Sequence, residues 1–543
     1  MLNIDYSNKK FLIIDSIKPS HDILKKFAMS LTTKQIDSIH YAQNVISLCL
    51  EKQYDVIFLG YDLGEKQKNG QQILEELRLS EVISRHCVVI IITAEMSQAM
   101  VLAALEHKPD SYLCKPYSIN TLQNRLNKCM LKKQVMFPIY KALENNETDL
   151  TVNLVNDALA NDTPYKIECL GIKSRQYFEL KQFNLAEEIY LTYQNEPNCE
   201  WANIGLGKIA LINNELINAE TIFKDMIAMR PLFLPAYDWL AQTYIKKCNN
   251  LIAEEILEQA IILSPRSVGR LKTFAGLCFD NKHFEKAADA YLNVHGLAEN
   301  SIHHSPENTI LFVKSLTQYS SNLPLLDAKK MNNRAFSMLA EMNRTFNHNS
   351  LKIQSYLLSA NLLENIRDFA PAKAKLKQGI ELLNKEQQNM DTEALSDIAS
   401  LLTKLRIDNE ASQVQITVNQ QKESKASFSG IEVDSLTGEQ LIENYTIRAQ
   451  HALDTGKELY ERKEYREAIN SLKEALLIFP NHSGIKLNLL QALLTAYEHD
   501  KFMLDEFKQA KKIILELIPI SKDNDINSRL KKMKKKYQLL AGI

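Results

Sequence analysis

Three successive segments in the middle of the chain repeat one pattern of residues at a spacing of 34. Within each segment the apolar residues recur at intervals of three and four, as they do on one face of an α-helix. Such a period is typical of helical units that each leave an apolar face to be covered by the next unit. The aligned positions are Leu206, Gly207, Ala219, Phe223 and Pro231, then Leu240, Ala241, Ala253, Leu257 and Pro265, then Phe274, Ala275, Ala287 and Tyr291.

The pattern resembles the tetratricopeptide repeat, a helix–turn–helix unit of about 34 residues. The small residues let neighbouring helices approach each other, the large residues fill the space between units, and proline ends a helix because it cannot continue one. Residues Gly456 to Pro480 keep the same internal spacing and predict a further unit. The resemblance implies a concave groove for partner proteins, and we expect Lys208, Gln242 and Lys272 on its wall.

The first quarter of the chain follows a different pattern, in which continuous apolar runs alternate with amphipathic helical segments. The runs cover residues 10–14, 56–59, 88–92 and 111–114. This alternation is typical of a parallel sheet with helices on both faces, in which the chemistry collects at the carboxyl ends of the strands. The residues at those ends are Asp15, Gly60, Thr93 and Lys115.

This segment resembles the receiver domain of bacterial response regulators, which implies a doubly wound α/β fold with a five-stranded parallel sheet over residues 1–130. The resemblance gives Asp15 a place in the acidic pair that binds magnesium and Thr93 a place beside the phosphoryl oxygens. It makes Lys115, which precedes Pro116, the counter-charge of the phosphoryl group. Tyr112 stands where the family has an aromatic residue that reports the switch.

Two carboxylates of the family's pattern are missing. Gly60 stands at the position of the phosphate-accepting aspartate, and Ser16 stands at the second position of the acidic pair. Magnesium is usually held by one or two carboxylates together with the phosphate, so we expect no cofactor unless the site is still active, with at most a weak residual magnesium site at Asp15. Asp62 falls where the family offers a backbone carbonyl to the metal. Without an acceptor aspartate, Lys115 is expected to pair with Asp15.

The 543 residues are too many for one ordinary domain. We expect a receiver-like domain over residues 1–130, joined near residues 130–139 to helical repeats over 140–407. Residues 408–440 are polar and lose the helical period, which predicts a flexible linker. A C-terminal set of repeats is expected over 441–543.

Composition and motifs exclude several other classes. A formal net charge of −1 gives no overall field toward nucleic acid or membrane. The eight cysteines form no CxxC pair, the known phosphate-loop and hydrolase motifs are absent, and no apolar run reaches the length of a membrane span. We therefore expect a cytoplasmic protein that is not an enzyme, with no structural metal and no DNA-binding domain.

The favoured hypothesis is a signalling scaffold of two-component type, in which a phosphorylation-deficient receiver is coupled to repeats that bind other proteins. One alternative is an active phosphorelay protein that is phosphorylated on Asp62 or Asp15. A second alternative is an RNA-associated repeat protein that uses the basic run at residues 529–536, although such a run is more often the solvated face of a helix.

Overall fold

The computed structural model describes residues 4–33, 35–64, 67–94, 97–428, 453–478, 483–499, 504–517 and 524–541. The chain divides into two compact units, Met1–Lys422 and Glu423–Ile543. Each unit is described by itself below.

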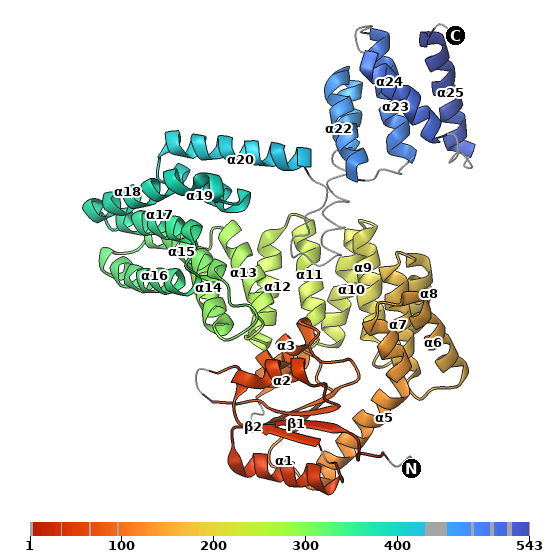
Figure 1. The fold of residues 1–543 in the computed structure, drawn as a ribbon, viewed down its shortest axis with the longest axis vertical. Helices are drawn as coiled ribbons and strands as arrows, with labels where there is room; N and C mark the ends of the chain where they lie inside the picture. Colours follow the sequence, from red (N-terminus) through yellow and green to blue (C-terminus); the bar gives the residue numbers. More distant parts are fainter. Residues whose placement is uncertain are drawn as a thin grey trace. The chain divides into compact units, whose positions relative to one another are not determined.

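The first unit begins with a five-stranded sheet in which all neighbouring strands are parallel and the order is β2-β1-β3-β4-β5 (Figure 1). The predicted receiver-like fold class is confirmed. The strands are β1 (Lys10–Ile14), β2 (Gln35–Ile39), β3 (Val56–Gly60), β4 (Val88–Thr93) and β5 (Ser111–Cys114). The helices between and after them are α1 (Lys18–Ser30), α2 (Val45–Glu51), α3 (Gly70–Leu79), α4 (Gln98–Glu106) and α5 (Ile119–Glu144).

The apolar runs of the sequence form the centre of this sheet because side chains on both of its faces are buried. Alternate residues of β1, such as Leu12 and Phe11, belong to two separate apolar cores on opposite faces. The strand order reverses between β1 and β3, and in open parallel sheets the crevice at this point is where a site forms. Asp15 and Gly60 lie at these two strand ends.

The helix α5 joins the sheet to the following helices without a break. Its first half places Leu122 and Leu126 in the core of the sheet, and its second half places Met136 and Ile139 in the next core. The sequence placed a boundary near residues 130–139, but the structure has one helix there, with Pro138 inside it. The boundary therefore lies within a helix, because that helix has an apolar face for each of its two neighbours.

Helices α6 to α19, which we call the helical array, continue as antiparallel pairs. The predicted spacing is present: α9, α11 and α13 begin at residues 200, 234 and 268. The turn inside successive pairs contains a residue with positive φ, at Lys181, Asn214, Cys248 and Lys282. Small residues pack against large ones, as expected from the repeat pattern. A Cβ atom on Gly207 would lie 2.2 Å from the Phe223 ring, so only glycine leaves room for this ring.

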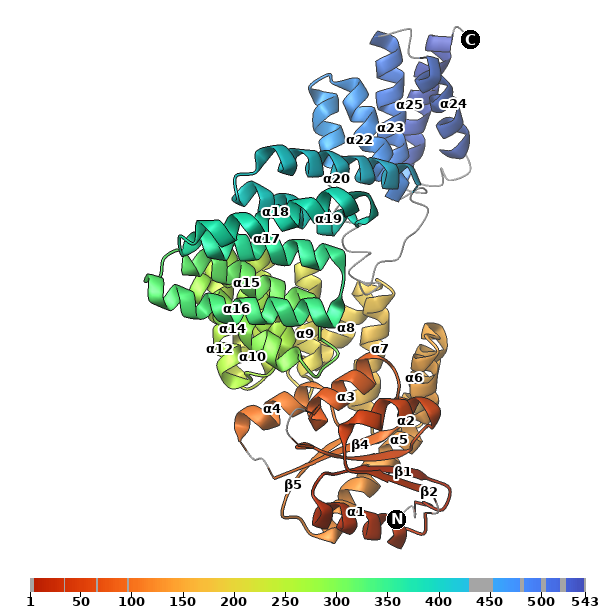
Figure 2. The same cartoon turned by 60° about the vertical axis from the view of Figure 1, so that its left-hand side comes forward.

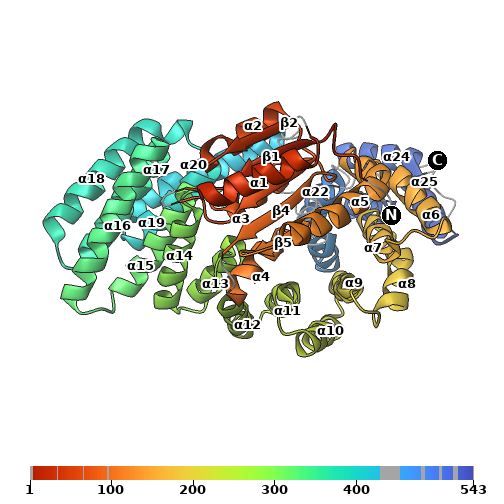
Figure 3. The same cartoon turned by 90° about the horizontal axis from the view of Figure 1, so that it is seen from below.

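The bounds of the array helices are as follows. The first ten are α6 (Thr148–Ala160), α7 (Lys166–Glu179), α8 (Phe183–Tyr193), α9 (Glu200–Ile212), α10 (Leu216–Met229), α11 (Leu234–Lys246), α12 (Asn250–Leu263), α13 (Val268–Asp280), α14 (Phe284–Ala298) and α15 (Pro306–Ser320). The later ones are α16 (Leu325–Phe346), α17 (Asn349–Asn365), α18 (Phe369–Glu386) and α19 (Thr392–Lys404). Seen from below, α7, α9, α11 and α13 form the inner row of an arc that faces the sheet, and α8, α10 and α12 form the outer row (Figure 3).

The first half of the predicted linker is helical. Residues Asp408–Phe428 form α20, which lies beside α19 in Figure 1 and in Figure 2. The buried side chains of Ala411, Val414 and Val418 attach this helix to the core of the array. The prediction of a flexible segment was wrong for residues 408–428, because these three residues supply an apolar stripe within a polar sequence. The rest of the predicted linker, residues 429–440, lies outside the described residues.

The second unit contains α22 (Tyr465–Ile478), α23 (Ser483–His499), α24 (Leu504–Leu517) and α25 (Asn524–Ala541). Residues 453–462 are also helical. A Cβ atom on Gly456 would lie 2.7 Å from Leu472, which explains the glycine of this predicted repeat unit. Among the described helices of the whole chain, none is both long and apolar enough to cross a membrane.

Candidate functional site

The carboxyl ends of β1, β3, β4 and β5 bring Asp15, Gly60, Thr93 and Lys115 to one edge of the sheet, as the sequence predicted. Gly60 lies directly against β1, where an added Cβ atom would be 3.0 Å from the Ile14 carbonyl oxygen and 3.3 Å from Asp15 Cα. Thr93 is buried at the end of β4, and its carbonyl accepts the Lys115 N–H at 2.7 Å. The Lys115–Pro116 peptide bond is cis.

Asp15 is the centre of this site, and its side chain is 1 % exposed. The Ile17 N–H donates to Oδ1 at 2.9 Å, and the Ser20 hydroxyl donates to Oδ2 at 2.6 Å. Lys115 Nζ also donates to Oδ2 at 2.8 Å, which is the ion pair expected from the sequence. Both carboxylate oxygens are therefore satisfied by groups of the protein, and the buried negative charge is balanced by one cation.

Ser16, just after β1, and Asp62, in the loop after β3, are joined by a hydrogen bond. The Ser16 hydroxyl donates to the backbone carbonyl of Asp62 at 2.8 Å. The exposed Asp62 side chain accepts the Gly64 N–H at 3.0 Å and so stabilises its own loop. Tyr112 on β5 is half-buried and packs against the core that includes Leu12.

Two histidines that the sequence did not single out lie close to Asp15. His40 Nδ1 is 3.1 Å from the Asp15 carbonyl oxygen, and the rings of His40 and His21 have centroids 4.1 Å apart. His21 is buried, and neither of its ring nitrogens has a hydrogen-bond partner among the described residues. Burial lowers the pKa of His21, and the neighbouring His40 lowers it further. No local sequence signal marks this pair, because the two residues come from different elements.

The loop and helices beside this site are joined to the array by hydrogen bonds. Arg266 Nη1 donates to the hydroxyl of Tyr61, the residue after Gly60, at 3.2 Å. On α3, Glu75 Oε1 is 2.8 Å from His303 Nε2 and 3.9 Å from His107 Nδ1. Burial alone would raise the pKa of Glu75, but the hydrogen bond to His303 and the charges of both histidines lower it. Polar contacts thus run from the strand end beside Gly60 to the turn after α14.

A second group of contacts holds the end of α4. The Glu106 carboxylate accepts the Ser264 hydroxyl at 2.6 Å and both Nη groups of Arg270 at 3.2 and 3.3 Å. Arg270 is 6 % exposed and also donates to both carboxylate oxygens of Asp238, at 2.7 and 2.8 Å. Leu102, one turn earlier on α4, packs against the apolar core of the array. The sheet domain and the array therefore share a mixed polar and apolar interface.

The three residues predicted on the groove wall lie on α9, α11 and α13, which form the inner row of the arc (Figure 3). Lys208 Nζ is 4.5 Å from the centre of the Trp239 ring and 5.5 Å from that of Phe178. Gln242 is exposed, and Lys272 Nζ lies 3.9 Å from Glu307. The three residues therefore lie on neighbouring helices of one row, and their side chains do not form one cluster.

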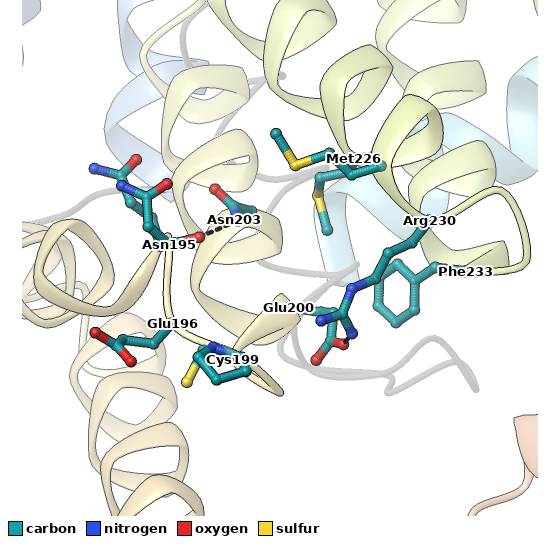
Figure 4. Close-up of a pocket in the computed structure, with 11 residues that line it drawn as sticks. Asn195, Glu196, Cys199, Glu200, Asn203, Met226, Arg230 and Phe233 are labelled. Carbon is teal, nitrogen blue, oxygen red and sulfur yellow. Dashed lines mark hydrogen bonds and ion pairs between the residues drawn. The ribbon is translucent and has the colours of Figure 1, made fainter.

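The array also contains a cavity of about 320 Å³ between the turn before α9 and the end of α10 (Figure 4). Asn203 donates to the Gln194 carbonyl at 2.7 Å across it, and Arg230 forms an ion pair with Glu200. These polar groups satisfy one another. No group of three or more potential metal ligands of the Asp, Glu, His or Cys types occurs here or elsewhere in the described ranges.

Comparison with known proteins identifies the sheet domain. Residues 11–127 match the family model described as the response regulator receiver domain. This segment is a response regulator receiver domain. Two curated relatives are the chemotaxis protein CheY-3 of two Vibrio cholerae strains, El Tor Inaba N16961 and Classical Ogawa 395. Each is 27% identical over 124 residues, which are 22% of this chain and 91% of the relative.

Two solved structures are similar to about a quarter of this chain. A two-component response regulator from Clostridium difficile is 26% identical, with a TM-score of 0.21, and the match covers 23% of this chain and 96% of that one. A receiver domain of the Francisella response regulator 1452 is 25% identical, with a TM-score of 0.21, and the match covers 23% and 98%. A receiver domain indicates a part in two-component signalling.

The magnesium ion that a receiver domain implies does not fit the residues present. The one carboxylate at the end of β1, that of Asp15, already accepts three hydrogen bonds, one of them from the cationic Lys115. The Asp62 carbonyl accepts the Ser16 hydroxyl. A hard divalent cation needs several free oxygen ligands. Here the Asp15 carboxylate binds the Lys115 ammonium instead.

Proposed function

We propose that the protein is a cytoplasmic signalling scaffold of the two-component type that uses no metal cofactor. In this proposal a receiver domain that cannot be phosphorylated at Gly60 is fixed to tetratricopeptide-type repeats that bind other proteins. The observation that carries the proposal is the ion pair between Asp15 and Lys115 at 2.8 Å, beside a glycine at the acceptor position. In the family this lysine balances the charge of the phosphoryl group. Here Lys115 already has a counter-charge, the Asp15 carboxylate.

The contacts between the receiver domain and the array support the proposal that the receiver domain keeps one conformation. A phosphoryl group adds about −1.5 to −2 charges and so drives the usual rearrangement. Here Tyr61 and α4, which lie beside the acceptor position, are attached to Arg266 and Arg270 of the array. We infer that the domain presents a constant surface and that the array supplies the binding function, as stacked helical repeats do.

The proposal is tested by incubating the full chain with acetyl phosphate and magnesium and measuring its intact mass. No phosphoryl adduct is expected. The Asp62→Asn and Asp15→Asn variants are measured in parallel, because these aspartates are the alternative acceptors. A stable adduct on the wild-type chain that disappears in either variant would overturn the phosphorylation-deficient part of the proposal.

The binding part of the proposal is tested on the groove wall. Charge reversal at Lys208 and Lys272, as Lys208→Glu with Lys272→Glu, is expected to weaken capture of partner proteins from the native cytosol. Helical content by circular dichroism and the melting temperature should stay nearly unchanged, because both side chains are only half-buried. A collapse of the melting temperature would make these residues structural and refute their assignment to the groove.

A further inference from the structure

The last helix of the second unit, α25, has two faces of different chemistry. It packs against α23 and α24 (Figure 1), and its apolar face consists of Leu530, Met533, Tyr537 and Leu540. Residues 524–541 contain six basic residues and one acidic residue. Because the apolar residues fix which side of the helix meets the core of this unit, most of the positive charge lies on the opposite side.

The exposed side of α25, which we call the lysine face, consists of Lys531, Lys532, Lys534 and Lys535. Their positions span just over one helical turn, so four positive charges lie along about 6 Å of the helix axis. In the part of the chain that the structure describes, none of these ammonium groups has a hydrogen bond or an ion pair with a carboxylate. Like charges at this spacing repel one another. An anion bound to the lysine face would remove that repulsion.

The two remaining basic residues of α25 attach the helix to its neighbour. Arg529 Nη2 donates to Asn488 Oδ1 at 2.9 Å, and Lys536 Nζ lies 2.7 Å from Glu498 Oε2. Both partners belong to α23. The lysine face lies between these two attachment points in the sequence and takes no part in them, so it is not needed to hold α25 in place.

A ladder of three stacked aromatic rings ends beside the lysine face. The ring of Phe507 stacks on that of Tyr497, with centroids 4.2 Å apart and planes inclined by 23°, and on that of Tyr537, at 4.7 Å and 14°. Tyr537 is half-buried, and among the described residues no ring other than Phe507 stacks on it. It follows Lys534 by three residues, so the two side chains are neighbours on the helix surface. A flat ring stacked on Tyr537 would extend the ladder next to the cations.

We propose that the lysine face and Tyr537 bind single-stranded nucleic acid, with phosphates at the lysines and a base on the tyrosine ring. The lysine ammonium is a compact charge that binds phosphate without a fixed geometry. An aromatic ring beside a row of cations binds bases of any sequence, because every base has a flat face. This inference goes beyond the proposed scaffold function and does not depend on it.

Other anionic partners fit the lysine face less well. A helix that binds a bilayer inserts its apolar face, but the apolar face of α25 is packed inside the second unit. An acidic protein segment would meet the lysines but would leave the ring of Tyr537 unused. The formal net charge of −1 gives the chain no overall field, so the attraction to phosphate is local to this face.

The test titrates the full chain into a fluorescein-labelled oligouridine of about 15 nucleotides and follows binding by anisotropy. An oligothymidine of the same length distinguishes RNA from DNA as the source of the ligand. An abasic strand of this length keeps the phosphates and lacks the bases. We expect the strands that carry bases to bind more tightly than the abasic strand. The logarithm of the affinity should fall linearly with that of the salt concentration, because phosphate contacts release counterions.

The lysine-face variant combines Lys531→Gln, Lys532→Gln, Lys534→Gln and Lys535→Gln. It should bind oligouridine at least about tenfold more weakly, and its salt slope should be smaller by about 2–3, since each phosphate contact on a single strand contributes about 0.7. Glutamine has nearly the helix propensity of lysine, so helical content and melting temperature should stay unchanged.

A matched control removes four exposed lysines from α16 and α18 of the array. It combines Lys329→Gln, Lys330→Gln, Lys373→Gln and Lys385→Gln, and it should bind oligouridine as the wild type does. The proposal is overturned if no strand binds, if the control loses as much affinity as the lysine-face variant, or if polyglutamate of equal charge binds as tightly as oligouridine. Equal affinity for the abasic strand would refute the stacking on Tyr537. Binding to phosphatidylglycerol vesicles without binding to oligouridine would make the ligand a membrane and refute the proposal.

Discussion

Arg270 of the array donates to both carboxylate oxygens of Glu106 at the end of the receiver helix α4, at 3.2 and 3.3 Å. Burial of the guanidinium would lower the pKa of Arg270, but the carboxylates of Asp238 and Glu106 raise it, so the cation is retained. A nearly buried arginine needs such partners, because an uncompensated buried charge is strongly destabilising. The array and the receiver thus each supply one carboxylate to this guanidinium.

Removal of the Glu106 carboxylate should loosen the receiver from the array. We expect Glu106→Ala to weaken the interface by about 1–2 kcal/mol, because Ser264 and Arg270 each lose a hydrogen-bond partner while Arg270 keeps Asp238. Hydrogen exchange should rise in α4 and at the α12–α13 turn and should stay unchanged in α1. Glu255→Ala, at an exposed position of α12, is the control. Equal exchange in both variants would show that the pair does not hold the interface.

The ion pair in the receiver pocket should behave as a coupled unit. We expect Asp15→Ala to destabilise the receiver by about 2–3 kcal/mol, because Lys115, Ser20 and the Ile17 N–H all lose their acceptor. Lys115→Met should cost about 1.5–3 kcal/mol, because the buried Asp15 carboxylate loses a charge-assisted hydrogen bond and its cation. The double variant should cost less than the two single changes together, since neither charge is then left alone.

This coupling is measured from the opening free energies of β1 and β3 amides by hydrogen exchange. Lys18→Met, at an exposed position on α1, is the control for loss of a lysine and should have little effect. Simple additivity of the Asp15 and Lys115 changes would contradict the assigned pair.

Gly60 and Gly269 provide a contrast in packing. A Cβ atom on Gly60 would lie 3.0 Å from a carbonyl oxygen of β1, and the backbone of a buried central strand has little room to move. Gly60→Ala should therefore destabilise the receiver by about 1–2 kcal/mol. A Cβ atom on Gly269, near the start of α13, meets nothing within 4 Å. Gly269→Ala should stabilise the array by about 0.5–1 kcal/mol.

Hydrogen exchange measures both effects. Exchange of the β3 amides should become faster in Gly60→Ala, and exchange of the α13 amides should become slower in Gly269→Ala. If Gly60→Ala is neutral or stabilising, then β1 and β3 can separate enough to accept a side chain, and close packing does not restrict this position.

Most of the receiver could be predicted from the sequence because its central strands are continuous apolar runs. The edge strand β2, with the sequence QIDSI, was not located, because it pairs only with β1 and its residues are exposed or half-buried. Such a strand carries almost no hydrophobic signal. Helix α20 was missed for a related reason, since three buried apolar residues are a weak signal in a polar segment.

The contacts between receiver and array could not be predicted from local patterns. Glu106 and Arg270 are 164 residues apart in the sequence. Taken alone, each would be predicted to be an exposed charged residue. Their pairing depends on the curvature of the array, which results from many small rotations between helix pairs. The position of Asp15, Thr93 and Lys115 at one edge of the sheet could be predicted because the carboxyl ends of parallel strands meet there.

Replacement of His21 should stabilise the receiver, most of all in mild acid. Neither of its ring nitrogens has a hydrogen-bond partner among the described residues, and the Asp22 carboxylate lies 3.8 Å from Nδ1. We therefore expect His21→Leu to stabilise the domain by about 1 kcal/mol near neutral pH, since an unsatisfied buried polar group is removed. His40→Leu should instead destabilise it, because His40 Nδ1 contacts the Asp15 carbonyl at 3.1 Å.

The pH dependence follows from the direction of the pKa shift. The pKa of folded His21 lies below the ordinary value of 6.5, first because of burial and then because of His40. The unfolded chain therefore binds a proton more readily than the folded chain, and the wild type loses stability as the pH falls through about 6.5. Leucine binds no proton, so the advantage of His21→Leu should grow from about pH 8 to about pH 6. Hydrogen exchange of α1 and β2 amides, corrected for the intrinsic rate at each pH, measures this difference. An advantage that is constant across this range would mean that the pKa of His21 is the same in the folded and the unfolded protein.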